Sequence, residues 1–229
     1  MKYEAVIFDL FGTLVDSYSS EEYQCVLSQM ASILTVPFDS FRRLWSETAG
    51  ERSLGIIRTI EANLEYICKQ TGVNTDSNKI ALANKLRYDF IAGTVKPNTE
   101  VIQTLTYLKS QGIKIGLISN CSPETPLIWK DTPFVRLVDE AVFSSSVGLR
   151  KPDARIYALA AARLAIKPEN CLYIGDGESG ELTGAKKAGM HPVLIRATIE
   201  SEAQSDWIDR NNWDGIIIQS LKEILDLME

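Results

Sequence analysis

Residues 5–15 read AVIFDLFGTLV, an apolar run followed by an acidic residue and a turn. The first four residues are too few for a helix and too continuous for a half-exposed strand, so they predict a strand buried on both faces. Asp9 closes this strand, and Gly12 permits a tight backbone turn beside it. In an open parallel α/β sheet, ligands bind at the carboxyl ends of the strands. The stretch therefore predicts either a carboxylate at a ligand-binding edge or an ordinary turn with a solvated Asp9.

The composition is that of a globular protein. The chain has 229 residues, 45% of them hydrophobic and 24% charged, which suits one large domain or one domain with an insertion. A net charge of −6 argues against nucleic acid or an anionic membrane as the main partner, because both need clustered Lys and Arg. We find no secretory signal, no run near the ~18 apolar residues of a membrane span, and no paired cysteine spacing. We therefore expect a cytoplasmic monomer or homodimer with reduced thiols.

The hydrophobic spacing changes along the chain. From about residue 20 to 92 it is helical, with no convincing strand, and beyond the turn at 96–98 strands and helices alternate. The later strands are expected at 113–118, 140–143, 171–174, 191–195 and 215–218, with helices around 101–108, 153–164, 182–188 and 221–228. Repeated βα units predict an α/β fold, a parallel-sheet Rossmann-like core formed by residues 1–15 plus 96–229. Residues 16–95, hereafter the helical insertion, then form a helical cap domain that lies over Asp9 as a lid.

Two further strands end in polar residues. Ser119 and Asn120 follow the apolar run at 115–118, and Gly175 and Asp176 follow the strand at 171–174. Because parallel strands deliver their carboxyl ends to one edge, Asp9, Ser119 and Asp176 are expected to converge. A single polar strand end is routine, but three such ends in one sheet favour a site.

With these residues in view, the chain resembles the haloacid dehalogenase-like hydrolase superfamily, with a helical cap inserted after the first motif. Residues 9–13 (DLFGT) match its first motif and Ser119 its second. Lys151, within RKPD, matches the third, and Gly175-Asp176 through Glu181 matches the fourth. Each motif alone is weak, whereas the four in this order are specific and cover nearly the whole chain.

The resemblance implies a role for each residue. Asp9 is the nucleophile that forms an aspartyl intermediate, which water then cleaves. Ser119 donates hydrogen bonds to the transferring group. Lys151 holds the charge of Asp9 together with a small anionic substrate. Further substrate contacts would come from Asn120 and from two residues of the first motif, Gly12 and Thr13.

The resemblance also implies a magnesium site. Asp9, the main-chain carbonyl of Phe11 and Asp176 are the protein ligands, because Mg²⁺ takes a few hard oxygen ligands and keeps several waters. Glu181 stands where the family has its second acidic residue of the fourth motif. Its longer side chain either reaches the metal through water or anchors the loop.

Phe11 departs from the pattern of the family's phosphatases, which carry there an Asp that protonates the leaving oxygen and activates water. The family's dehalogenases have an aromatic residue at this position, and a departing halide needs no proton. Those dehalogenases work without metal, however, and lack the pair Gly175-Asp176. The leading hypothesis is therefore Mg²⁺-dependent hydrolysis of a small phosphorylated metabolite. A 2-haloacid dehalogenase and a catalytically weak member that binds a phosphorylated ligand remain the alternatives.

Overall fold

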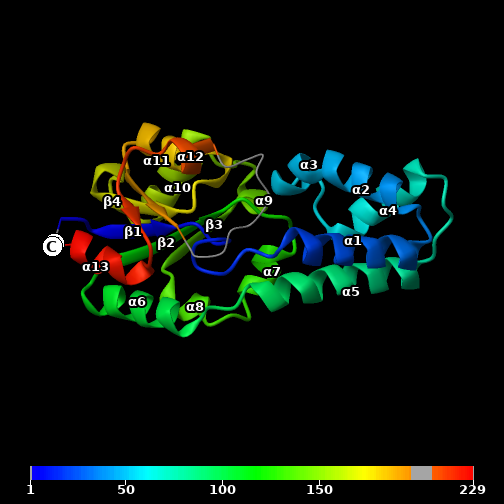
Figure 1. Ribbon diagram of the computed structural model, residues 1–229, viewed down its shortest axis with the longest axis horizontal. Coiled ribbons are helices and arrows are strands. Elements are labelled where there is room, and N and C mark those ends of the chain that lie inside the picture. Colours follow the sequence, from blue (N-terminus) through cyan, green and yellow to red (C-terminus); the bar gives the residue numbers. More distant parts are fainter. Residues whose placement is uncertain (1, 197–207, 229) are drawn as a thin grey trace.

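The first apolar run forms β1 (Ala5–Phe8), the central strand of a parallel sheet in this computed structural model, which describes residues 2–196 and 208–228 (Figure 1). The strand order is β3-β2-β1-β4-β5-β6, and every pairing is parallel. The other strands are β2 (Lys114–Ser119), β3 (Glu140–Phe143), β4 (Cys171–Gly175), β5 (His191–Ile195) and β6 (Ile217–Ile218). The predicted Rossmann-like α/β class is thus confirmed.

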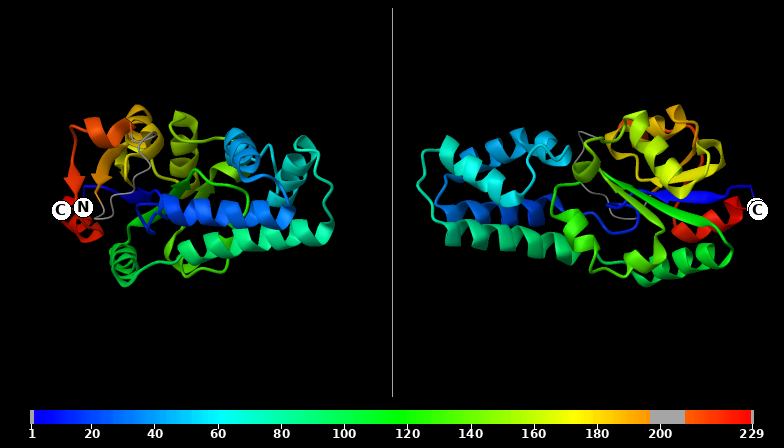
Figure 2. Two further views of the ribbon diagram at one scale, coloured as in Figure 1. Left: turned by 45° about the vertical axis from the view of Figure 1, so that its right-hand side comes forward. Right: turned by 180° about the vertical axis from the view of Figure 1, so that it is seen from behind.

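Both faces of β1 are buried, as its continuous apolar pattern requires. Val6 and Phe8 enter the hydrophobic cluster on one face, and Ala5 and Ile7 the cluster on the other. Figures 1 and 2 show two layers of helices around the sheet. One layer holds α6 (Thr99–Ser110), α8 (Phe134–Leu137) and α13 (Ile224–Leu227), and the other α10 (Ala154–Leu164), α11 (Glu181–Lys187) and α12 (Ile208–Asn212). Full burial of a side chain such as Phe8 contributes about 1.5–3 kcal/mol.

The helical insertion forms a separate group of helices beyond the carboxyl edge of the sheet (Figures 1 and 2). It comprises α1 (Ser20–Leu34), α2 (Phe38–Glu47), α3 (Ala49–Ser53), α4 (Ile60–Gln70) and α5 (Ser77–Thr94). These helices bury a hydrophobic cluster of their own, which includes Leu34, Phe41 and Leu64. At the start of α1, the side chain of Ser19 accepts a hydrogen bond from the Glu22 N–H, and the Glu22 side chain accepts one from the Ser19 N–H. This capping box fixes the point at which the insertion begins.

Several element boundaries differ from the expectations. Within the stretch of helical spacing, α4 begins at Ile60 because the Thr59 hydroxyl accepts a hydrogen bond from Ala62 N at 3.1 Å and caps the helix there. The strand expected at 215–218 is only β6, and the last helix divides into a 3₁₀ turn (Leu221–Glu223) and α13. Sequence periodicity missed α3, α8, α12, α7 (Thr125–Trp129), α9 (Ser144–Val147) and the 3₁₀ turns Pro168–Asn170 and Glu178–Gly180, all too short to repeat a pattern. None of the described helices has the length and apolar character needed to cross a bilayer.

Candidate active site

The sheet order places the three polar strand ends side by side. β1 lies between β2 and β4, and Phe8 is in register with Leu117 on one side and Ile174 on the other. The main-chain N–H of Asp9 continues the ladder by donating to the Ile174 carbonyl at 2.9 Å. Asp9 and the residues that follow β2 and β4 therefore share one edge of the sheet.

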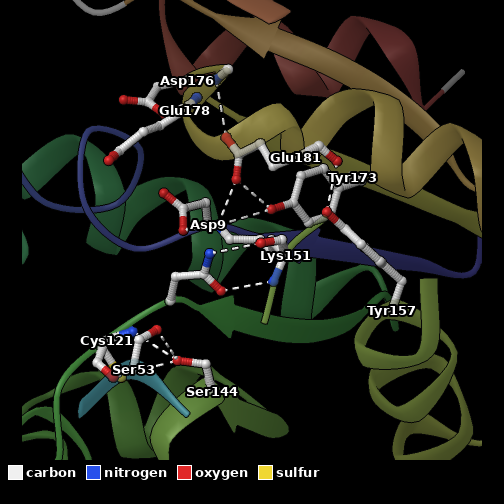
Figure 3. A network of polar contacts seen from close by, with 12 residues as sticks. Asp9, Ser53, Cys121, Ser144, Lys151, Tyr157, Tyr173, Asp176, Glu178 and Glu181 are labelled. Atoms are coloured by element: carbon white, nitrogen blue, oxygen red, sulfur yellow. Dashed lines mark hydrogen bonds and ion pairs between the residues drawn. The ribbon is translucent and has the colours of Figure 1, made fainter. Parts of the chain in front are cut away.

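Three carboxylates gather at this edge. One oxygen from each of Asp9, Asp176 and Glu181 lies within 4.8 Å of the others, and all three residues are buried (Figure 3). Two glycines make room for them. A Cβ at Gly12 would lie 2.2 Å from Asp176 Oδ2, and a Cβ at Gly175 would lie 2.1 Å from Glu181 Oε1. The absence of side chains at these two positions is thus what allows the carboxylates to come together.

Lys151 supplies the positive charge next to these carboxylates. Its ammonium group forms an ion pair with Asp9 and a second one with Glu181, at 2.5 Å from Oε2 (Figure 3). Asn120, which directly follows β2, holds the main chain of Lys151 through two hydrogen bonds. Lys151 N donates to Asn120 Oδ1 at 2.8 Å, and Asn120 Nδ2 donates to the Lys151 carbonyl at 3.1 Å. Asn120 thereby fixes where Lys151 enters the site.

The Glu181 carboxylate is fully engaged by protein donors. Besides Lys151, Tyr173 donates its hydroxyl to Oε2 at 2.7 Å, and Gly177 N donates to Oε1 at 3.0 Å. Tyr157 donates its hydroxyl to the Glu181 carbonyl at 2.8 Å. These contacts anchor the loop that follows β4. Whether Glu181 also reaches the metal through water stays a prediction, because one of its oxygens lies within 4.8 Å of oxygens of Asp9 and Asp176.

The buried charges do not balance. Three carboxylates face one ammonium, a net charge of −2 when all are ionised. Burial raises the pKa of Asp9 to about 7, with Glu181 adding to the rise and Lys151 opposing it. Burial also raises the pKa of Asp176 well above its ordinary value, reinforced by Glu181 and Asp9. Burial alone would lower the pKa of Lys151, but its two carboxylate partners outweigh this effect and raise it. A cation at this edge would relieve the excess negative charge.

The donor set fits a hard divalent cation. Asp176 Oδ1 accepts a hydrogen bond from Glu178 N at 3.1 Å, while Oδ2 accepts none from the described residues and lies over Gly12. Carboxylate oxygens next to a main-chain turn are the ligands that Mg²⁺ takes in proteins. The arrangement at Asp9, Asp176 and the turn after β1 is therefore chemically suited to this ion.

Two buried hydroxyls near the carboxylates have no partner. Ser119 Oγ and Thr13 Oγ1 are inaccessible to solvent and make no hydrogen bond within the described part of the chain. Buried polar groups of this kind are rare, because each costs about 1–3 kcal/mol when unsatisfied. Neither hydroxyl is committed to a partner in the described part of the chain, and their donation to a bound anion stays a prediction.

Residues 3–189 match the family model of the haloacid dehalogenase-like hydrolases. The chain belongs to this family. A glyceraldehyde 3-phosphate phosphatase from Methanothermobacter thermautotrophicus is 27% identical, over 98% of this chain and 99% of its own. The (S)-2-haloacid dehalogenase H-109 from Pseudomonas putida is 25% identical, over 99% of this chain and 95% of its own. A solved enzyme of the family from Bacteroides thetaiotaomicron, in complex with magnesium and inorganic phosphate, superposes with a TM-score of 0.63 at 16% identity, over 90% of this chain and 97% of that one.

The geometry of this haloacid dehalogenase-like hydrolase brings together most of the residues that the sequence singled out. Asp9, Lys151, Asp176 and Glu181 form one cluster, with the Gly12 turn against Asp176. The contacts of Asn120 go to the main chain of Lys151, and its contact with substrate stays a prediction. Phe11 is half-buried, and its ring packs edge-on against Tyr18 with the centroids 6.2 Å apart.

Sequence reasoning missed two polar features beside the site. Tyr173 lies in a strand buried on both faces, and a buried phenol needs a hydrogen-bond partner, so this signal was present. Arg87, on α5, forms a buried ion pair with Glu124 through Nε and Oε1 at 2.9 Å. Arg87 occupies a core-facing position of α5, between the buried residues Ala83 and Ile91. The helical insertion is thereby joined to the loop before α7.

Proposed function

We propose that this haloacid dehalogenase-like hydrolase is a Mg²⁺-dependent phosphatase that hydrolyses a small phosphorylated metabolite through an aspartyl intermediate on Asp9. The observation that carries the proposal is the buried excess of negative charge, with Asp176 Oδ2 left without a hydrogen-bond partner among the described residues and held over Gly12. The phosphatase named among the relatives and the magnesium and phosphate bound by the structural neighbour support this choice.

The chain's own residues would act as follows. A carboxylate oxygen of Asp9 forms a bond to phosphorus while the bond from phosphorus to the leaving oxygen breaks. The leaving oxygen takes its proton from water, because Phe11 has none to give. The hydroxyls of Ser119 and Thr13 donate to the transferring group, and Lys151 offsets its charge next to Asp9. Water then attacks the aspartyl phosphate, which releases phosphate and restores Asp9. Glu181 keeps Lys151 in place throughout.

Asp9, Asp176 and the Phe11 carbonyl would hold the Mg²⁺ ion, with Glu181 outside its direct ligands because both Glu181 oxygens are engaged. When bound, the ion supplies positive charge that polarises the phosphoryl oxygens. The helical insertion, residues 16–95, would act as the cap that closes over this edge. We place the protein in the cytoplasm, as a monomer or homodimer, as part of the same proposal.

Phe11 favours a second candidate, a 2-haloacid dehalogenase. The position offers no carboxylate to protonate a leaving alkoxide, and halide departs without a proton. The relative named as an (S)-2-haloacid dehalogenase covers nearly the whole chain. In that reaction Asp9 would displace the halide from carbon, and the Asp176 carboxylate would have no ion to bind.

One experiment separates the two enzymes from a catalytically weak phospho-ligand-binding protein. Purified protein is assayed for phosphate release from a panel of phosphorylated metabolites in Mg²⁺, and for halide release from 2-haloacids in EDTA. We expect phosphate release that requires Mg²⁺ and is lost in Asp9→Asn. Halide release in EDTA without phosphate release would replace the phosphatase by the dehalogenase. Binding of phosphorylated ligands with neither activity would leave the binding protein.

A further inference from the structure

The helical insertion contains a cleft of about 790 Å³ between α1 and the α2–α3 segment. A volume of this size is typical of small-molecule sites. Its lining residues include Tyr23, Trp45 and Arg52. Arg42 and Arg43 also line it, together with Asp39 and Glu47, and each of these exposed arginines lies near one of the two acids, at 3.9 and 2.9 Å. These four charges therefore offset one another.

Arg52 is the lining residue whose charge is not offset. It is 3% exposed and forms no ion pair with the described residues. Its hydrogen bonds run from Nη1 alone, to Thr48 Oγ1 at 2.7 Å and Asn63 Oδ1 at 2.9 Å, and its Nε has no partner in the described part of the chain. Its guanidinium carbon Cζ lies 3.9 Å from the centre of the Trp45 ring, which is within the range of a cation–π contact.

The surroundings of Arg52 add to the positive charge. A second guanidinium, Arg87, lies 5.7 Å from the same Trp45 ring and takes up Glu124 as its partner. Two buried cations thus share one buried carboxylate, which leaves a charge of +1 to be met by an anion. Burial lowers the pKa of Arg52 to about 10, so the group stays charged at neutral pH. The planar guanidinium of Arg52, with its Nε–H donor unused, suits a carboxylate or phosphate group.

The cleft adjoins the carboxyl edge of the sheet through two chains of contacts. Tyr23 stacks on Tyr18 at 5.1 Å, and Tyr18 packs against Phe11, two residues after the candidate nucleophile. On the other side, Ser53 follows Arg52 directly and lies 3.2 Å from Ser144, hydroxyl to hydroxyl, within the view of the site in Figure 3. Both chains of contacts thus connect residues at or next to the cleft with residues that follow β1 and β3.

We propose that Arg52 binds a second acidic group of the substrate, so that the substrate class is a phosphate monoester carrying a carboxylate or a further phosphate. This inference rests on the proposed function, because the first phosphate occupies the site at Asp9. Arg52 acts as a specificity residue and takes no part in the bond changes. A charge-assisted pair of this kind raises kcat/KM for acid-tailed esters by about 10- to 100-fold.

The test compares three esters of equal chain length: propyl phosphate, 3-phosphooxypropanoate and propane-1,3-diyl bisphosphate. The wild-type chain should prefer one or both acid-tailed esters by about 10-fold or more, and the preferred one identifies the acidic group. Arg52→Met should remove this preference, so that the three esters are hydrolysed with similar kcat/KM. Arg58→Met, an exposed arginine of the same insertion, is the matched control and should behave as wild type.

Two results would overturn the inference: no preference in the wild type, or an equal loss for all three esters in Arg52→Met. If Arg52→Met fails to fold, Arg52→Lys takes its place. It keeps the positive charge but loses the planar N–H donors of the guanidinium, so it should lose part of the preference for acid-tailed esters. If the wild type releases phosphate from none of the esters, that result counts against the proposed function and not against the role of Arg52. Titration of the same three compounds into the wild-type chain then decides the role of Arg52. Tighter binding of an acid-tailed compound that is reduced in Arg52→Lys supports this role, and equal binding of the three compounds refutes it.

Discussion

Gly12 and Gly112 form a matched pair for testing the metal site, because φ is +76° at both. Replacing either residue with Ala forces a Cβ into the left-handed region, at a cost of about 1–2 kcal/mol in unfolding free energy. The surroundings differ. A Cβ at Gly112 has no heavy atom within 4 Å, whereas a Cβ at Gly12 would lie 2.2 Å from Asp176 Oδ2 and 2.9 Å from its Cγ.

That contact cannot persist in Gly12→Ala, since carbon and oxygen rest more than 3 Å apart. Asp176 or the turn must shift by about 1 Å to reach an ordinary contact distance. Metal–ligand distances tolerate only about 0.2 Å, and displaced supporting groups typically lower metal affinity by about 10- to 100-fold. We therefore expect Gly12→Ala to weaken Mg²⁺ binding by that factor, and Gly112→Ala to leave it unchanged.

The assay is calorimetric titration of Mg²⁺ into each variant, with urea unfolding in EDTA and in Mg²⁺ as a second readout. Both variants should lose similar stability in EDTA from backbone strain, with any extra loss in Gly12→Ala coming from the displaced carboxylate. Only Gly112→Ala should recover the wild-type stabilisation by Mg²⁺. Equal Mg²⁺ affinity in the two variants would refute the placement of the ion between Asp176 and the turn after β1.

Three further predictions concern other groups. Lys151→Met leaves the buried carboxylates without their cation and should lower the unfolding free energy in EDTA by about 3–5 kcal/mol, as measured by urea unfolding. The control is Lys109→Met, which removes a half-exposed ion pair and should cost at most about 1 kcal/mol. Phe11→Asp should raise phosphate release by about 10²-fold if only the acid/base group is missing, while Phe11→Asn should not, since an amide has no proton to give. Burial alone would raise the pKa of Asp139, but hydrogen bonds from the Ile115 N–H and Lys109 outweigh it and lower this pKa. The ionised Asp139 therefore stabilises the fold fully above its unfolded pKa, and this stabilisation is lost as the pH falls towards its folded pKa. The stability of the wild type should therefore fall more steeply than that of Asp139→Asn between about pH 5 and pH 3, in thermal unfolding scans.

The sheet could be predicted because its strands are short apolar runs that end in Asp9, Ser119 and the pair Gly175-Asp176. In a parallel sheet such ends meet at one edge whatever the details of the packing. The fold class and the family are confirmed on this basis. The limits of the helical insertion as a domain and the roles of the site residues stay predictions.

What the sequence did not reveal depends on contacts between distant segments. The hydrogen bond from Tyr173 to Glu181 and the ion pair of Arg87 with Glu124 join residues whose types are ordinary for a strand and a helix. No local pattern records which of several polar side chains will meet. Arg52 illustrates the same limit, since a solvated helix face and a buried unpaired guanidinium are indistinguishable in one sequence.

The buried ion pair between Arg87 and Glu124 also holds the helical insertion against the part of the chain that contains the sheet. Separating a buried pair costs about 3–5 kcal/mol, whereas the contact between the hydroxyls of Ser53 and Ser144 is readily exchanged for water. The contact made by α5 is therefore the stronger of the two, and we expect any separation of the insertion from the sheet to begin at α3. On this expectation, a substrate would enter beside Ser53 and Arg52.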